Sequence, residues 1–388
     1  MTILSNIGLQ VSTTEDIKVM EVKSRKDWNV FFDVAIAIHQ GDPNWVCPLR
    51  TSFFDVLNVK KNPFWAKKRM LPVVVYYKDK PAGRAVFFEN KDYNTYNNVH
   101  AGFFGFFECI HHRATADALF DVGENWLRSF GYDKVIGPFN PSLNYELGIL
   151  TKGFDAPPFV MMTHNAPYYM SLLADNGYYK ARDFKSYIIQ SESISVANPY
   201  SDRHRENLIK WSSFKLRPVN IEDFPNEIKL LHGIYNDGFA AHWGYSPMSL
   251  DEFQFIGKSL VNIIDPDLFL IAECDNEPAG FVMCMPNINE LLKKVPNGRL
   301  FPFGLYQLLF RRNTIKSVRA STMVMRKKFQ HLGLGGMMYT SLVKTIIAKK
   351  YTSAEISWVI EENEVMHHVA DWANGAPYKT YRVYQKDL

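Results

Sequence analysis

A glycine-rich turn is the segment of this sequence whose residue types point most directly to chemistry. A β-rich run ends near Met325, the chain turns through Gln330-His-Leu-Gly-Leu-Gly-Gly336, and an amphipathic helix follows. Glycine lets a backbone approach a ligand closely. The start of a helix offers free N–H groups and a partial positive charge. With Arg326, Lys327 and Lys328 beside it, the turn predicts a site for a diphosphate group.

The turn lacks the features of two common nucleotide sites. The P-loop pattern G-x-x-x-x-G-K-[ST] is absent from the sequence. A dinucleotide fingerprint would need a third glycine where Met338 stands. A glycine-rich helix start without a ligand remains the alternative interpretation of the same residues.

Two carboxylates in the first half are candidate general bases. The segment from Gly137 to Gly148 is rich in turn-forming and apolar residues, yet it contains Asn144, Tyr145 and Glu146. A partly buried Glu146 would have a raised pKa, which suits a base, with Asn144 and Tyr145 contacting substrate. Glu108, at the end of a β-rich run, is the second candidate. Local backbone capping by Glu146 and a surface salt bridge of Glu108 are the structural alternatives.

A third candidate base lies in the second half, in Ala241-His-Trp-Gly-Tyr245. His242 titrates near neutral pH, and Trp243 and Tyr245 are candidate substrate contacts. A packed or solvent-exposed loop histidine is the alternative. No cluster of His, Cys and Asp has the spacing of a metal site, so we expect no metal.

The segment 288–313 combines apolar and basic residues. Lys293, Lys294, Arg311 and Arg312 flank a run rich in Leu and Phe. Such a segment could contact lipid headgroups at a membrane surface, or cover a long acyl chain as a lid. A helical hairpin packed on the core is the alternative.

The elements that position these residues occur twice. Lys80–Asn90 and Glu277–Asn287 share Pro-Ala-Gly at an offset of 197 residues, and Asn165–Gly177 matches Asn363–Gly375 at an offset of 198. Two matches at nearly equal offsets predict a tandem duplication. We expect domains at 1–190 and 213–388, joined by a linker at 191–212 that contains a helix through 203–211.

Hydrophobic periodicity and turn residues predict the same order of elements in both halves. Strands and helices in this mixed order predict an α/β (α+β layered) sheet. In the first half we expect strands at 18–23, 71–78, 82–89, 98–109 and 133–138 and helices at 114–130 and 167–175; in the second, strands at 214–219, 268–274, 279–285, 317–326, 353–360 and 378–385 and helices at 222–240, 249–261, 334–349 and 363–373.

The composition excludes several classes of protein. A net charge of +4 over 388 residues is too small to favour nucleic acid as a partner. No apolar run approaches the length of a membrane span, and the first residues do not form a secretory signal. The four cysteines are far apart, which fits a reducing compartment. We therefore expect a cytoplasmic protein.

The order of motifs resembles that of a known superfamily. Q-x-x-G-x-G after a central strand, then a helix, a strand, a helix led by Asn363 and a last strand, resembles motifs A and B of the GNAT (GCN5-related N-acetyltransferase) superfamily. The resemblance covers most of 214–388, and the first half is similar to a second copy. Asn297–Gly304, Phe103–Glu108 and Glu362–Asn363 look like a bacterial group of uncharacterised tandem GNAT-like proteins.

The resemblance implies two tandem GNAT-like domains. Each has a mixed central sheet with a splayed pair of parallel strands, flanked by helices. Acetyl-CoA or a longer acyl-CoA would lie between the strands at 317–326 and 353–360, as co-substrate. The residues that the resemblance places against this cofactor are the backbone groups of Met325 and Lys327 on the pantetheine arm, the turn of Gln330, Leu332, Gly333, Leu334, Gly335 and Gly336 on the diphosphate, and Asn363.

The sequence departs from the family pattern at two places. The tyrosine that often serves as general acid is replaced by Asp371, and by Leu173 in the first half. His367 and His368 are the nearest substitutes. The first half has Cys109–Thr115 where the glycine-rich turn should be, and no glycine there. The resemblance then implies a first half that is degenerate for CoA binding and helps to form the acceptor pocket.

These features together predict an acyl-CoA-dependent N-acyltransferase. The acyl group would pass from the CoA thioester to a primary amine, with lipid-like amines among the candidate acceptors. The alternative is a non-catalytic acyl-CoA-binding or regulatory protein, which the missing tyrosine favours.

Overall fold

The computed structural model describes residues 16–193, 214–330 and 332–388. Most of the predicted linker at 191–212, and the helix predicted through 203–211, lie outside the described residues.

The first half forms the elements that the sequence predicts, together with three further helices and four further strands. A serine-led capping box starts one of them, because the side chain of Ser24 accepts from the Asp27 N–H and that of Asp27 accepts from the Ser24 N–H. The elements are β1 (Ile17–Glu21), α2 (Arg25–Ile38), α3 (Arg50–Leu57), β2 (Met70–Tyr77), β3 (Lys80–Glu89), α4 (Lys91–Asn97), β4 (Ala101–Cys109), α5 (Arg113–Arg128), β5 (Lys134–Gly137), β6 (Phe139–Asn140), β7 (Glu146–Leu147), β8 (Ile149–Lys152), α6 (Tyr169–Asp175) and β9 (Tyr179–Gln190).

The second half repeats this order and adds an irregular helical segment between two of its strands. The predicted strands and helices lie within three residues of the observed ones. The elements are β10 (Phe214–Pro218), α8 (Phe224–Gly238), α9 (Leu250–Leu260), β11 (Phe269–Cys274), β12 (Glu277–Pro286), α10 (Asn289–Leu292), a π-helical turn (Leu300–Gly304), α11 (Leu305–Phe310), β13 (Ser317–Met325), α12 (Leu334–Ala348), β14 (Ser353–Ile360), α13 (Glu364–Trp372) and β15 (Ala376–Asp387).

One large sheet runs through both halves. Its order is β1-β2-β3-β4-β5-β15-β9-β14-β13-β12-β11-β10, so the strands of the two halves mirror each other about the β15–β9 pair. The only parallel pairs among the described strands are β4 with β5 and β13 with β14. The mixed layered fold and the tandem arrangement predicted from the sequence are thus confirmed.

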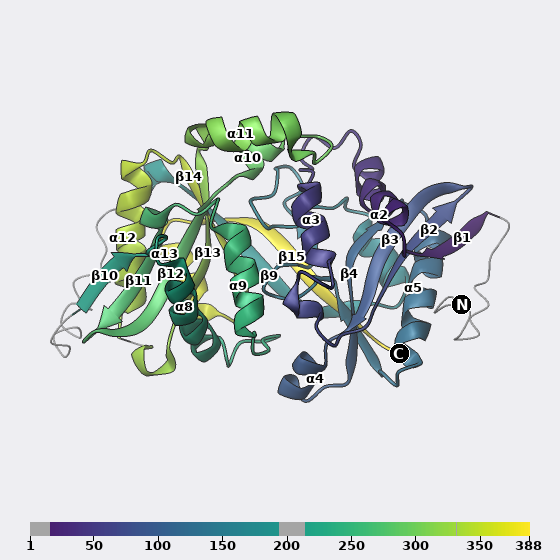
Figure 1. The fold of residues 1–388 in the computed structure, drawn as a ribbon, viewed down its shortest axis with the longest axis horizontal. Coiled ribbons are helices and arrows are strands. Elements are labelled where there is room, and N and C mark those ends of the chain that lie inside the picture. Colours follow the sequence, from purple (N-terminus) through teal and green to yellow (C-terminus); the bar gives the residue numbers. More distant parts are fainter. Residues whose placement is uncertain (1–15, 194–213, 331) are drawn as a thin grey trace.

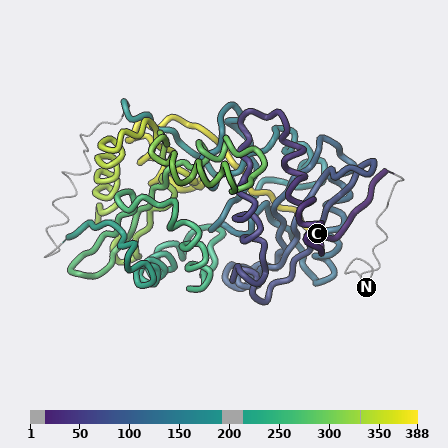
Figure 2. The backbone as a smooth tube through the Cα atoms, turned by 45° about the horizontal axis from the view of Figure 1, so that its top comes forward, coloured from purple at the N-terminus to yellow at the C-terminus, as the bar shows by residue number. Residues whose placement is uncertain are grey.

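The last strand of each half is exchanged with the other half. β9 pairs with β14, and β15 pairs with β5. The two exchanged strands, β9 and β15, lie beside each other in the middle of the molecule (Figure 1). Figure 2 shows the yellow C-terminal strand passing into the part of the molecule formed by the purple and blue first half. Gln190 of β9 pairs with Ser353, and Asp387 of β15 pairs with Lys134. The equivalent positions Gln190 and Asp387 of the two exchanged strands are 197 residues apart, the same offset as the Pro-Ala-Gly pair. The exchange makes the junction between the halves part of one continuous sheet.

Helices cover both faces of each half of the sheet. In the first half α5 packs on one face and α2 on the other, over cores rich in Phe and Val. In the second half α12 packs on β11 and β12, whereas α8 contacts the opposite face through β12 and β13. The apolar cluster on the α8–α9 side also includes Val160 and Met161, so this face of the second half meets the first half.

Candidate active site

The central feature of the second half is the point where β13 and β14 separate. They pair in parallel only from Ser317 to Ala320 on β13. At Ser321 the pairing of β13 with β12 also shifts, because Met283 opposes Thr322 and Cys284 opposes Ala320. This β-bulge turns the strand locally. Beyond it, no described strand pairs with the β14-facing edge of β13, which leaves an open cleft.

The glycine-rich turn lies at the mouth of this cleft. Gly333 caps α12 with a φ of 81°, a left-handed conformation that favours glycine. Within the described residues, the backbone N–H groups of Leu332, Gly333, Leu334 and Gly335 donate no hydrogen bond. A Cβ atom at Gly335 would meet only Met323 Sδ at 3.5 Å and Met325 Cε at 3.6 Å. The turn thus presents free donors beside the cleft, as an anion site requires.

Three other residues that the resemblance assigned to the cofactor have partners within the protein. The Lys327 N–H donates to Asp237 Oδ2 on α8 at 3.2 Å. The side-chain amide of Gln330 donates to the Met325 carbonyl at 3.2 Å and so closes the turn. Asn363 caps α13 by accepting from the Met366 N–H at 3.1 Å. These contacts hold the turn and α13 at the edge of the cleft.

A large cavity of about 320 Å³ opens from the cleft and crosses to the other face of the sheet. This volume falls within the range of ligand pockets. Its wall is mainly apolar and comes from both halves. The wall includes Met323, Tyr339, Leu342, Ile346, Ile356, Trp358 and Val369 at the cleft, Ile228, Leu231, Tyr235, Phe253, Ile256 and Leu260 from α8 and α9, and Phe103, Phe139, Leu143, Met161 and Phe184 from the first half.

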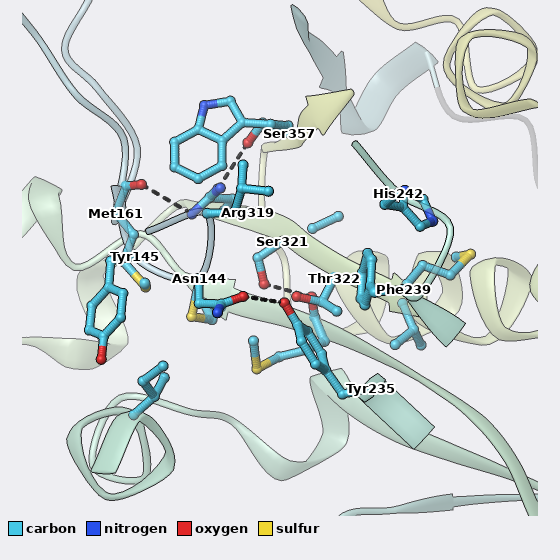
Figure 3. Close-up of a pocket in the computed structure, with 18 of the residues that line it drawn as sticks. Asn144, Tyr145, Met161, Tyr235, Phe239, His242, Arg319, Ser321, Thr322 and Ser357 are labelled. Atoms are coloured by element: carbon cyan, nitrogen blue, oxygen red, sulfur yellow. Dashed lines mark hydrogen bonds between the residues drawn. The ribbon is translucent and has the colours of Figure 1, made fainter. Parts of the chain in front are cut away.

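The predicted substrate residues meet in this cavity. Asn144, Tyr145, Trp243 and Tyr245 all line it, although two come from the first half and two from the second. Tyr235 donates to Asn144 Oδ1 across the junction, as Figure 3 shows. The first half thus supplies part of the wall of the cavity.

One buried cation lies in the wall at the base of the cleft. Arg319 is 3% exposed, and it donates from Nε to Ser357 Oγ at 2.9 Å (Figure 3) and from Nη1 to the Val160 carbonyl at 3.0 Å. Its Nη2 group has no hydrogen-bond partner among the described residues. Because Arg319 lines the cavity, this group can donate to an oxygen atom of a ligand there.

Glu355 lies beside Arg319 in the buried part of the sheet. It is fully buried, and burial raises its pKa to about 7, against the opposing effect of the Arg319 charge. Lys379 is buried nearby, and burial lowers its pKa to about 8. The charges of Arg319 and Lys379 both act to lower the pKa of Glu355, against the larger effect of its burial.

His242 is the one predicted base that lies in the cavity wall. The residue as a whole is exposed at the edge of the cavity, and its side chain has no hydrogen bond within the described residues. Partial burial lowers its pKa, so the imidazole is neutral at pH 7. A neutral imidazole with an open ring nitrogen can accept a proton.

The two predicted carboxylate bases lie elsewhere. Burial raises the pKa of Glu146, as expected, but its side chain is not among the described residues that form the cavity wall. Glu108 accepts from Tyr169 at 2.7 Å, pairs with His39 at 2.9 Å and lies 3.5 Å from Arg84. Burial opposes these partners, but together they lower its pKa, and it is also absent from the wall. This placement does not support either residue as the base.

A carboxylate that sequence analysis missed lies in a side pocket. Glu252, on α9, is 8% exposed and lines a small pocket that shares Asn144 and Met248 with the main cavity. Its Oε1 atom is buried without a hydrogen-bond partner. Burial raises its pKa to about 7. The sequence signal was ambiguous, because Glu252 also occupies the first turn of a helix capped by Ser249.

Asp371 stands where many GNAT enzymes have an acidic tyrosine, so another group must supply the proton for the thiolate. His367, one of the substitutes, is bound by the Tyr187 hydroxyl at 2.7 Å. Tyr339 on α12 lies in the cavity wall, where burial raises its pKa. Its hydroxyl can donate a proton within the cleft, and the sequence did not single it out.

The equivalent cleft of the first half is filled by its own side chains. The Phe106 N–H, at the bulge of β4, donates to Asn140 Oδ1 at 2.6 Å. The Tyr168 hydroxyl donates to the Cys109 carbonyl at 2.8 Å, and the Cys109 N–H donates to the Tyr169 hydroxyl at 3.3 Å. These backbone groups correspond to those that face the open cleft of the second half. In the first half, the side chains of Asn140, Tyr168 and Tyr169 thus occupy the backbone hydrogen-bonding groups that a ligand could use in the second half.

Within the described residues, no cluster of three or more His, Cys, Asp or Glu side chains is placed to hold a metal ion. None of the helices in the described part of the chain has the length and apolar character that crossing a bilayer requires.

Two curated proteins resemble the chain over nearly its whole length. It is 34% identical over 385 residues to the bacterial ceramide synthase of Caulobacter vibrioides, covering 97% of this chain and 99% of that protein. It is 29% identical over 379 residues to the protein YghO of Escherichia coli, covering 94% of each. No model of a known protein family matches the chain.

Solved structures with the same fold include a tandem GNAT protein and other GCN5-related N-acetyltransferases. A tandem GNAT protein from the clavulanic acid biosynthesis pathway superposes with a TM-score of 0.57 at 8% identity, covering 96% of this chain and 98% of that one. A GCN5-related N-acetyltransferase from Sphaerobacter thermophilus superposes with a TM-score of 0.55 at 11% identity, covering 97% of both chains. At such low identity the likeness establishes the fold, which is that of GNAT acyltransferases.

Proposed function

This chain belongs to the GNAT superfamily, in the same family as the bacterial ceramide synthase of Caulobacter vibrioides, and we propose that it transfers an acyl group from acyl-CoA to a long-chain primary amine. A ceramide is the amide of a fatty acid with a long-chain amino alcohol, so this reaction has the same chemistry as the relative's name implies. The proposal covers both the acyl-CoA donor and the lipid-like acceptor.

The observation that carries the proposal is the apolar cavity that continues from the cleft. The cleft between β13 and β14 begins at the free N–H groups of the glycine-rich turn, and the cavity beyond it is lined by Phe, Leu, Ile and Met side chains. A diphosphate would bind at the turn, and an alkyl chain in the cavity would be removed from water, which is favourable by about 0.8 kcal/mol per buried CH₂ group. An acetyl group is too short to contact most of the apolar side chains of this wall.

The reaction is a direct attack of the amine on the thioester. The ammonium form must first lose a proton, and the neutral amine then forms a bond to the carbonyl carbon. The carbonyl oxygen becomes negative, and Arg319 Nη2 is the group that would stabilise this charge. The C–S bond then breaks, and Tyr339 is our candidate donor of a proton to the leaving thiolate. The second amine proton returns to the Tyr339 phenolate, so the reaction releases only the first amine proton, which the base holds.

Two groups could accept the amine proton, and the dependence of rate on pH distinguishes them. A base must be deprotonated, so kcat falls as the pH falls through its pKa in the enzyme–substrate complex. Loss of activity with a midpoint below 6.5 indicates His242, whose pKa is lowered. A midpoint near pH 7 indicates Glu252, whose pKa is about 7. The measurement is kcat at saturating substrate between pH 5 and 9.

The variants His242→Gln and Glu252→Gln provide the matched comparison. Removing the base should lower kcat by about 100-fold and abolish the acidic limb, whereas removing the other group should leave the limb in place. An acidic limb that survives in both variants would contradict the assignment of the base to either residue.

The direct test of the function uses purified protein, acyl-CoA esters from acetyl to palmitoyl, and a long-chain 2-amino-1,3-diol. We expect equal amounts of free CoA thiol and of amide, measured by mass spectrometry, with palmitoyl-CoA used better than acetyl-CoA. A short amine such as ethanolamine should be a poor acceptor. Preference for acetyl-CoA and short amines would contradict a lipid-like acceptor.

Position 371 is an aspartate and not the tyrosine that often serves as general acid. This replacement favours a second candidate function, a protein that binds acyl-CoA without catalysing its reaction. The same assay decides between the two. Saturable binding of palmitoyl-CoA without thiol release, across a broad set of amines, would favour the binding protein.

A further inference from the structure

Six of the large exposed apolar side chains in the described part of the second half gather in one short segment, whereas Val365 and Ile347 lie apart from it. Phe301 and Phe303 are 77% and 75% exposed, and Phe310 is 68% exposed. They lie in the π-helical turn and α11, which Figure 1 shows together with α10 along one side of the molecule. We call this surface the 301–310 patch; it consists of Phe301, Phe303, Leu305, Tyr306, Leu309 and Phe310.

Basic residues surround the patch and acidic ones are nearly absent. Between 288 and 316 there are six lysines and arginines and one acid, Glu290. Glu290 accepts from backbone N–H groups of Lys316 and Ser317, so it is already partnered. None of the surrounding cations makes an ion pair within the described residues. These cations are Lys293, Lys294, Arg299, Arg311 and Arg312, all of them exposed.

Buried side chains and hydrogen bonds to the first half fix the position of the segment that carries the 301–310 patch, while the side chains of the patch are exposed to solvent. Leu291, Leu292 and Val295 are buried beneath it. The chain just before the patch is tied to the first half, because the Arg50 N–H donates to the Gly298 carbonyl at 2.9 Å. Arg50 Nε also donates to the Asn297 carbonyl at 3.0 Å. The patch is thus presented over the junction of the two halves.

The core beneath the patch is also part of the cavity wall. Leu308, on α11, packs against the same apolar cluster as Leu291, Ile264 and Met285. Ile264 and Met285 in turn line the cavity. One continuous apolar layer therefore separates the patch from the substrate cavity.

We propose that the 301–310 patch docks on the surface of a lipid bilayer that contains anionic phospholipid. Aromatic and leucine side chains would enter the boundary between headgroups and acyl chains, and the surrounding cations would pair with anionic headgroups. The charge around the patch selects this occupant over a second copy of the chain, since two such surfaces would bring like charges together. The inference goes beyond the proposed reaction and locates the enzyme where a long-chain amine would dissolve.

The test is flotation of the full chain with vesicles, without any substrate, so its outcome does not depend on turnover. One vesicle is phosphatidylcholine alone, and the other contains phosphatidylglycerol as well. We expect binding to the anionic vesicles, and at least a tenfold lower partition coefficient for the variant Phe301→Ser/Phe303→Ser/Phe310→Ser. The matched control, Met20→Ser/Val59→Ser/Val99→Ser, removes exposed apolar residues of the first half and should bind like the original chain.

A second variant separates the electrostatic contribution. Lys293→Gln/Lys294→Gln/Arg311→Gln should weaken binding to anionic vesicles, as should high salt, and should leave the weak binding to phosphatidylcholine unchanged. The proposal is overturned if the original chain does not float, or if the phenylalanine variant binds as well as the control. It is also overturned if the phenylalanine variant changes only the oligomeric state in sedimentation, which would make the patch an interface between copies.

Discussion

Replacing Gly335 by glutamate is expected to raise the dissociation constant for palmitoyl-CoA at least about 100-fold, or about 2.7 kcal/mol. The free N–H groups of Leu332, Gly333, Leu334 and Gly335 face the place where we put the diphosphate. A glutamate at 335 would add bulk and a negative charge at that place. Calorimetric titration measures the effect, and should give one binding site in the original chain, because the first-half cleft is filled by Asn140, Tyr168 and Tyr169.

The control for this change is Gly335→Ala. The φ angle at Gly335 is not in the left-handed region, and a Cβ there makes only ordinary contacts with Met323 and Met325. Alanine should therefore leave the melting temperature and the affinity nearly unchanged. If the glutamate variant is folded and binds palmitoyl-CoA as tightly as the alanine variant, the diphosphate does not lie at this turn.

Arg319→Lys is expected to lower kcat by about 100-fold, the effect of losing one donor to a developing oxyanion. Lysine keeps the positive charge, but it lacks the planar fork that holds Ser357 and the Val160 carbonyl while leaving Nη2 free. Because the expected contact forms in the transition state, the KM for acyl-CoA should change little. Steady-state kinetics and calorimetry with palmitoyl-CoA measure the two quantities.

Arg319 is also a structural residue, so stability must be measured with activity. Ser357→Ala serves as the comparison, because it removes the hydrogen bond to Nε and leaves the guanidinium in place. We expect a smaller loss of kcat for Ser357→Ala than for Arg319→Lys. A folded Arg319→Lys protein that keeps the original kcat would remove Arg319 from the reaction.

The elements nearest the cleft were predictable from the sequence because local signals define their ends. Glycine at 333 and asparagine at 363 each mark a helix start, and α12 and α13 begin one residue later. Ser24 and Asp27 mark the start of α2 by a signal of the same kind, a capping box. Turn and cap chemistry is local, and so it can be read without the fold.

The exchange of β9 and β15 could not be predicted in the same way. An antiparallel edge accepts any strand of suitable pattern, so the sequence of β9 does not state whether β5 or β14 is its neighbour. The choice is made by the packing of the two halves. That packing also builds the cavity wall from Asn144, Tyr145, Trp243 and Tyr245 together.

The chemistry of individual residues depends on burial, which the sequence does not give. Glu108 and Glu252 are both glutamates beside apolar residues, yet Glu108 has three partners and a lowered pKa, whereas Glu252 has an unpartnered oxygen and a pKa of about 7. Arg319 is one of two arginines in the predicted strand 317–326, and only the fold shows that it is buried. Long-range contacts decide which of them has a group free for a ligand.

The most direct test of the account is a crystal structure of the protein with palmitoyl-CoA, obtained without an amine. We predict the diphosphate on the backbone N–H groups of residues 332–335, the thioester between β13 and β14 with its oxygen near Arg319, and the alkyl chain inside the cavity among the side chains of α8 and α9. A diphosphate bound elsewhere, or an acyl chain left in solvent with the cavity unfilled, would contradict it.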